Sequence, residues 1–151
     1  MRVIVDANII FSGILNSAGN IGNLLINSKH VFNFIAPNFL RKEIRSHYSK
    51  LMDISKLSFE QIWEEEYRIC KSVSFISEEQ ILLDNWEFAY HLVKDIDPND
   101  VIYVAFAKQF ECKLWTGDKR LATGLSAKGF ENTILTDELL ALRRQIENGL
   151  R

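Results

Sequence analysis

The sequence predicts an α/β fold: a three-layer sandwich in which helices cover both faces of a central, mostly parallel sheet. Short apolar runs alternate along the chain with segments whose apolar residues recur at helical spacing. The first of these runs, residues 2–5, is apolar on both faces, which is typical of a central strand in a parallel sheet. At 151 residues, 47% of them hydrophobic, the chain fits a single domain, residues 1–151.

The expected elements follow one another with turn residues between them. Strands are expected at residues 2–5, 31–36, 73–76, 112–116 and 132–135. Helices are expected at residues 21–28, 37 to about 50, 58–72, 84–94, from 97 onward and from 136 onward. Ser58 and Gln61 have the spacing of a capping box, and Pro98 fits the first turn of its helix. The three tryptophans are expected in the core rather than as base-stacking platforms: Trp63, Trp86 and Trp115.

The composition of the chain excludes several classes of protein. The formal net charge is −2, so any nucleic-acid-binding surface must be local rather than a property of the whole chain. Cys70 and Cys112 lack C-x-x-C spacing, which argues against a zinc knuckle or a disulfide framework and favours core thiols in a reducing compartment. No signal peptide or apolar run of about 20 residues is evident. We therefore expect a cytoplasmic protein without a membrane partner.

Acidic residues fall where the expected strands end. Asp6 follows the first strand, and Asp118 lies just beyond the strand at 112–116. Asp100 lies in the first turn of the helix that leads into that strand. Ligands of parallel sheets bind outside the carboxyl ends of the strands, and right-handed crossovers bring helix starts to that edge. The sequence thus predicts that these three carboxylates meet at one rim.

Glu43 is expected at the margin of the same rim, half buried near the start of its helix. Clustered carboxylates raise one another's pKa, so a cation is expected among them. An all-oxygen donor set favours Mg²⁺ or Mn²⁺, either of which can support displacement at phosphorus. The nearby basic residues Arg41, Lys42 and Arg45 are candidates for contacting RNA phosphates, although such a run is usually a solvated helix face.

Each acid also has a purely structural interpretation. Asp6 and Asp118 could be turn residues, and Asp100 could act only on the helix dipole. Glu43 lies among basic residues and could belong to a salt-bridged surface. For Asp97, capping of the helix that Pro98 begins is favoured over metal ligation. The shared rim favours the functional interpretation for the set as a whole.

Four segments, in order, resemble the PIN domain family. They are Val5-Asp6-Ala7-Asn8, Ala36-Pro37 with Glu43-Ile44, Asp97-Pro98-Asn99-Asp100, and Trp115-Thr116-Gly117-Asp118. Within the family, the chain most resembles the bacterial VapC-like toxin components of toxin–antitoxin pairs.

The resemblance implies a Mg²⁺- or Mn²⁺-dependent endoribonuclease with an antitoxin partner and a homodimeric state. Asp6, Glu43, Asp100 and Asp118 match the family's acidic positions. Asn8 and Thr116 match its polar positions beside the metal. Ala7 and Asn99 depart from the usual pattern, so Asp97 and Asp100 compete for the third ligand role, with Asp100 favoured.

Two other functions compete with the nuclease. The first is a binding module that keeps the PIN fold without activity, for which Ala7 and Asn99 leave room. The second is an aspartate-phosphorylating hydrolase, which also opens with a strand that ends in Asp. That class needs another Asp two residues later, and Asn8 occupies the position here.

Overall fold

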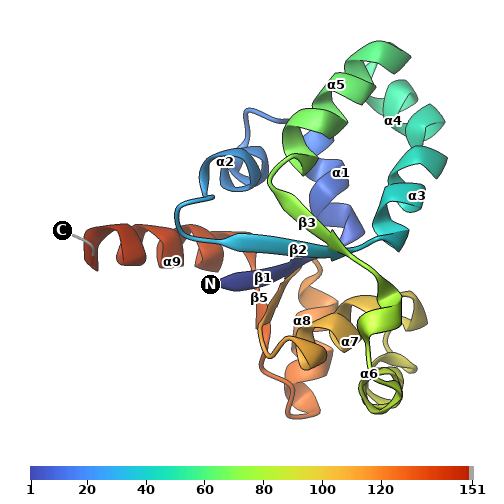
Figure 1. The fold of residues 1–151 in the computed structure, drawn as a ribbon, viewed down its shortest axis with the longest axis vertical. Helices are drawn as coiled ribbons and strands as arrows, with labels where there is room; N and C mark the ends of the chain where they lie inside the picture. The colour runs from blue at the N-terminus through green and yellow to red at the C-terminus, as the bar shows by residue number, and fades with distance from the viewer. Residues whose placement is uncertain (150–151) are drawn as a thin grey trace.

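In the computed structural model, which describes residues 1–149, five strands form one central sheet (Figure 1). The strands are β1 (Arg2–Val5), β2 (Asn33–Pro37), β3 (Val73–Ile76), β4 (Lys113–Trp115) and β5 (Thr133–Ile134). Their order across the sheet is β3-β2-β1-β4-β5, and every neighbouring pair is parallel. The expected three-layer α/β sandwich is confirmed. Residues 150–151, the end of the predicted domain, lie outside the described residues.

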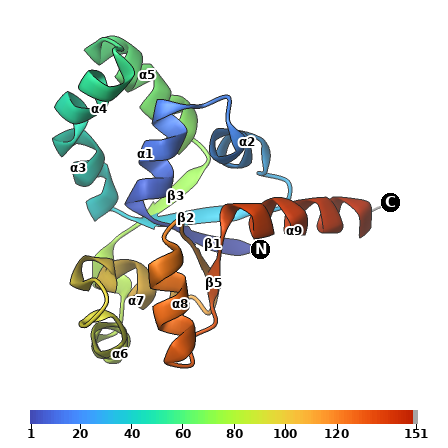
Figure 2. The same cartoon turned by 180° about the vertical axis from the view of Figure 1, so that it is seen from behind.

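Helices cover both faces of this sheet (Figures 1 and 2). One face carries α1 (Ala7–Leu15), α2 (Asn20–Asn27), α3 (Phe39–Ser46), α4 (Tyr48–Ser55), α5 (Phe59–Cys70) and, at the end of the chain, α9 (Thr136–Gly149). The other face carries α6 (Leu83–Val93), α7 (Val101–Gln109) and α8 (Lys119–Ala127). Val3 and Val5 pack into the first core and Ile4 into the second, so both faces of β1 are buried, as the apolar run predicts.

Each strand lies within two residues of its expected bounds, but the helices differ in three places. The helix expected from residue 37 to about 50 breaks at His47, whose amide donates to the carbonyl of Ile44, and continues as α4 to Ser55. Sequence analysis missed α1 and α8 altogether. Each of these two helices begins directly after an acidic residue, Asp6 or Asp118.

The capping box of α5 forms as predicted between Ser58 and Gln61. The tryptophans differ in their exposure to solvent, however. Trp115 is fully buried, whereas 57% of Trp63 is exposed, contrary to its expected core position. Among residues 1–149, no single helix has the length and apolar character needed to cross a membrane. The pair α1 and α2 would have them together, but the two helices are bent by 104°.

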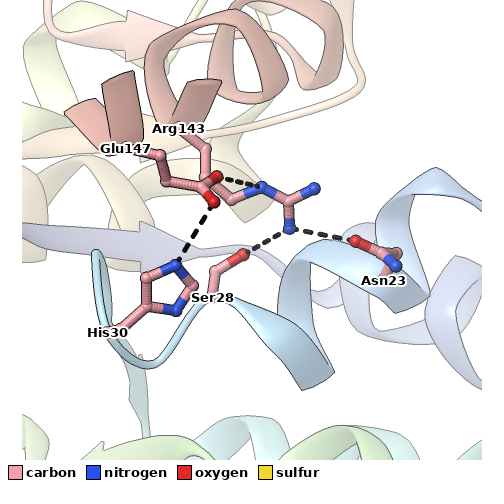
Figure 3. Close-up of polar contacts among 5 residues, drawn as sticks. All are labelled: Asn23, Ser28, His30, Arg143 and Glu147. Carbon is pink, nitrogen blue, oxygen red and sulfur yellow. Dashed lines mark hydrogen bonds and ion pairs between the residues drawn. The ribbon is translucent and has the colours of Figure 1, made fainter. Parts of the chain in front are cut away.

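The helix α9 is attached to α2 and the following loop by polar contacts (Figure 3). The guanidinium of Arg143 donates to Asn23 Oδ1 at 2.9 Å and to the buried Ser28 Oγ at 3.0 Å. Glu147 lies 3.4 Å from Arg143 Nε and 3.6 Å from His30 Nε2. Arg143 therefore satisfies a hydroxyl that has no exposure to water.

We expect Arg143→Met to lower the free energy of unfolding by about 1–2 kcal/mol, because the buried Ser28 hydroxyl loses its partner while the aliphatic packing is kept. Urea denaturation measures the change. Arg144→Met, at an exposed neighbouring position, is the matched control and should change stability by less than about 0.5 kcal/mol. Equal losses in both variants would contradict this role of Arg143.

Candidate active site at the carboxyl edge of the sheet

Asp6 and Asp118 lie at the same edge of the sheet. Asp6 follows β1 and Asp118 follows β4 after a short turn. The two strands are parallel neighbours, with Val5 paired to Trp115, so their carboxyl ends coincide. The strand-end argument from the sequence therefore places these two residues correctly.

Asp6 is buried, with 4% of its surface exposed. Its Oδ1 accepts a hydrogen bond from the amide of Ile9 at 3.0 Å and so caps α1. Burial raises the pKa of this carboxyl from 3.8 to about 6, and the charge of Asp118 adds to the effect. Hydrogen bonds from Ile9 and Thr116 oppose the increase. A buried carboxyl with this pKa is partly protonated near neutral pH.

Asp100 ends the 3₁₀ turn Pro98–Asp100 that precedes α7, and its side chain is half buried. Burial is the main cause that raises its pKa from 3.8 to about 7, and the charges of Asp97, Asp6 and Asp118 follow in that order. The carboxylates are thus near enough to act on one another. The Asp100 side chain caps no helix amide, which leaves both of its oxygens available.

Asp97 makes a local contact: its Oδ1 accepts from the amide of Asn99 at 3.0 Å. This is the capping role that the sequence favoured for it. Its charge nevertheless reaches Asp100. The choice of Asp100 over Asp97 as a metal ligand stays a prediction.

Thr116 connects the two strand-end acids. Its side chain is fully buried, its hydroxyl accepts from the amide of Asp118 at 3.1 Å, and it also bonds to Asp6. Asp118 itself is exposed and caps α8 through Leu121, whose amide lies 3.1 Å from Oδ1. Asn8 is exposed in the first turn of α1, beside Asp6. Both predicted polar positions therefore adjoin the acids.

Tyr103 is a residue of this region that sequence analysis missed. It lies on α7 and is 5% exposed. Burial chiefly raises its pKa, followed by the charges of Asp6, Glu43 and Asp100. Tyr103 is thus surrounded by three acids from three elements, and its phenol stays protonated. Its position three residues after Asp100, on the same side of a helix, is the signal that could have identified it.

Glu43 is half buried on α3, as expected, and its charge reaches Tyr103. The basic residues around it are arranged differently from the sequence-based picture. Arg41 and Arg45 lie about 200° around the helix from Glu43 and line a cavity beside α5. Lys42 is exposed. The predicted contacts of these cations with RNA therefore do not follow from their being neighbours of Glu43 in the sequence.

The site is rich in carboxylates and poor in positive charge. Among residues 1–149, no ion pair involves Asp6, Glu43, Asp100 or Asp118. In the same part of the chain, no three His, Cys, Asp or Glu side chains are close enough together to hold one metal ion. Asp6 and Asp118 each direct one oxygen at a helix amide. The donor set nevertheless suits a hard divalent cation, because it is all oxygen and its buried members carry unbalanced charge.

We expect Asp100→Asn to stabilise the metal-free protein at pH 8 by about 2 kcal/mol, roughly half of what the full pKa shift would give, because solvent screens this half-exposed side chain. A carboxyl whose folded pKa of about 7 exceeds its unfolded value binds more protons when folded. Its contribution to stability is therefore fully present below about pH 4 and is lost as the pH rises through 7. Because an asparagine at this position does not titrate, the variant keeps that stability as the pH rises.

Thermal melting in chelator at pH 4.5 and pH 8 measures this difference. The gain should be large at pH 8 and much smaller at pH 4.5, which is close to the unfolded pKa of 3.8. Asp53→Asn, at an exposed position on α4, is the matched control and should show no such dependence on pH. If Asp100→Asn destabilises the protein equally at both pH values, Asp100 has a structural role instead of belonging to a repelling cluster.

Solved structures of other proteins share this fold. The fold is similar to that in the crystal structure of VapBC2 from Rickettsia felis bound to a DNA fragment from their promoter, with a TM-score of 0.66, 16% identity, and coverage of 89% of this chain and 97% of the other. It is also similar to PAE2754 from Pyrobaculum aerophilum, with a TM-score of 0.66, 12% identity, and coverage of 96% and 90%. No curated protein matches the sequence.

A family match covers most of the chain. Residues 4–138 match the PIN domain, and this range includes the second half of β1, strands β2 to β5, helices α1 to α8 and each of the acidic positions described above. The resemblance noted in the sequence is therefore confirmed, and the chain belongs to the PIN domain family.

Proposed function

We propose that this protein is a divalent-metal-dependent endoribonuclease that cleaves single-stranded RNA. The observation that carries the proposal is the group of carboxyls at the carboxyl edge of the sheet. Two of them, Asp6 and Asp100, have pKa values raised to about 6 and about 7 by burial and by neighbouring acids. Membership of a family of nucleases supports the hydrolytic chemistry.

In this proposal Asp6, Asp100 and Asp118 hold the ion, Glu43 lies at the margin, and Asp97 is the alternative third ligand. A bound Mg²⁺ or Mn²⁺ supplies positive charge that polarises the phosphodiester and activates water. The proposal requires the carboxylates to move closer together than they lie here, since no three of the described acidic side chains are arranged to hold an ion.

The surrounding residues fix the ligands. Thr116 and the amide of Ile9 hold Asp6, and Thr116 also accepts from the amide of Asp118. Tyr103 is buried on α7 among these acids, and its phenol hydroxyl stays protonated. Asn8, exposed beside Asp6, is available to contact the RNA backbone. Protons compete with the cation for Asp6 and Asp100, so binding of the ion should strengthen as the pH rises through 6 to 7.

We further propose that the protein is the toxin of a toxin–antitoxin pair, with an antitoxin protein as partner. The structural likeness to VapBC2 supports this role. A homodimer, which the family resemblance implies, and a cytoplasmic location, expected from the sequence, complete the proposal.

A second candidate is a PIN-fold module that binds nucleic acid or a protein partner without cleaving. Ala7, which departs from the family's usual pattern, favours it, as does the spacing of the acids. Cleavage in the presence of metal, and its loss in chelator, separates the two candidates.

We expect Asp6→Asn to reduce RNA cleavage on the order of 100-fold or more, because it removes a charge from the metal ligands. The fold should persist, since the asparagine oxygen can still accept from Ile9. An end-labelled single-stranded RNA, incubated with Mn²⁺, Mg²⁺ or chelator, provides the assay. Asp53→Asn is the control and should cleave as the wild type does. Equal cleavage by the Asp6 variant, or full activity in chelator, would contradict the proposal.

A further inference from the structure

A second cavity lies apart from the acidic rim, between α3, α5 and the start of the edge strand β3. Its volume is about 730 Å³. Its lining combines the cations Arg41, Arg45 and Lys71 with the rings of Trp63 and Tyr67 and the carboxylates of Glu64 and Glu66. Since α3 carries Glu43 on its other side, this helix separates the cavity from the acidic rim.

Two aromatic rings of this cavity face solvent. Trp63 is 57% exposed and Tyr67 is 69% exposed, and the two lie one turn apart on α5. Neighbours at this spacing share a helix face. Adjacent exposed rings are unfavourable in water unless something covers them. Because every nucleobase has an aromatic face, such a pair provides a stacking surface that does not depend on base sequence.

Cations surround these rings from two elements. The Arg41 guanidinium lies 3.8 Å from the centre of the Phe75 ring, which holds it against β3. Arg68 pairs with Glu65 at 3.1 Å, whereas Arg41, Arg45 and Lys71 make no ion pair within residues 1–149. Three positive charges are therefore available to an anionic ligand.

The buried groups of the cavity point to binding rather than chemistry. Burial, followed by the charge of Glu66, raises the pKa of the Cys70 thiol to about 12, so it stays protonated and cannot act as a nucleophile. Glu66 is 5% exposed and accepts a hydrogen bond from the Tyr48 hydroxyl. Its charge is thus directed into the wall, and the open part of the cavity presents rings and cations, with Glu64 as its exposed carboxylate.

We propose that this cavity is a second binding site for single-stranded RNA, which holds nucleotides of the substrate outside the catalytic rim. The inference rests on the proposed function for the identity of the ligand. RNA is favoured over an acidic protein segment because phosphates match the cations while bases match Trp63 and Tyr67. A carboxylate-rich peptide would leave those rings uncovered. An RNA that occupies both sites has to cross α3, about 10–12 Å wide.

Binding is tested in chelator, where cleavage does not interfere. A fluorescently end-labelled oligouridine of about 12 nucleotides, within the range that single-stranded sites cover, is titrated with protein while its fluorescence anisotropy is followed. Trp63→Ala should weaken binding by roughly 5- to 150-fold, which corresponds to the loss of one stacked base. Tyr67→Ala is a second variant with the same expectation. Tyr90→Ala, at a ring of α6 that is 52% exposed, is the control and should bind normally.

Salt dependence tests the cations. The double variant Arg45→Gln/Lys71→Gln should flatten the slope of log affinity against log salt by about 1.4, since each phosphate contact contributes about 0.7 for single strands. Lys29→Gln/Lys56→Gln removes two exposed charges elsewhere and should leave the slope unchanged. Unchanged affinity in both aromatic variants, or an unchanged slope in the first double variant, overturns the second site. So does stronger competition by polyglutamate than by RNA, because the cavity then takes an acidic protein segment.

Cleavage assays with Mn²⁺ separate this inference from the proposed function. If both hold, Trp63→Ala raises KM for long RNA and leaves cleavage of a dinucleotide unchanged. If RNA binding depends on Trp63 but the wild type cleaves RNA under no metal condition, the second site is retained and the nuclease function is rejected. Normal cleavage and binding by Trp63→Ala rejects the second site and retains the nuclease.

Discussion

The repulsion among carboxylates at the carboxyl edge of a parallel sheet is the constraint on which the functional part of this molecule depends. Because β1 lies at the centre of the sheet, Asp6 is placed where burial is greatest and where β4 brings Asp118 alongside. Ionised carboxylates in such a position cost free energy. A stable fold retains them only when protons or a cation balance the charge, and this requirement connects the topology with the proposed chemistry.

The same side chains organise the local backbone. Asp6 begins α1, Asp118 begins α8, and Asp97 begins the turn before α7. Each accepts from a backbone amide, so the starts of α1, of α8 and of the turn before α7 are held at the rim by the acids that define it. Thr116 joins two of these acids from the end of β4. The position of each acid and the helix or turn that begins beside it therefore depend on one another, and a change of side chain at the rim alters both.

The helix α3 divides two regions of different chemistry. One side carries Glu43 toward Tyr103 and the acidic rim, and the other carries Arg41 and Arg45 toward the aromatic cavity beside α5. The spacing of two residues between Arg41 and Glu43 is what sends them to opposite sides of one helix. A single short helix can thus contribute to a negatively charged site and to a cationic one without their charges cancelling.

The sequence by itself determined the fold class, the strands and the edge at which Asp6, Asp100 and Asp118 lie, because strand ends and helix starts follow from local patterns. It did not identify α1 and α8, whose starts depend on capping by Asp6 and Asp118 after the strands end. Tertiary structure alone decided the burial that raises the pKa values of Asp6 and Asp100, since burial depends on every element packed above the rim. It also decided the exposure of Trp63, because helical spacing shows which residues share a face but not whether another element covers that face.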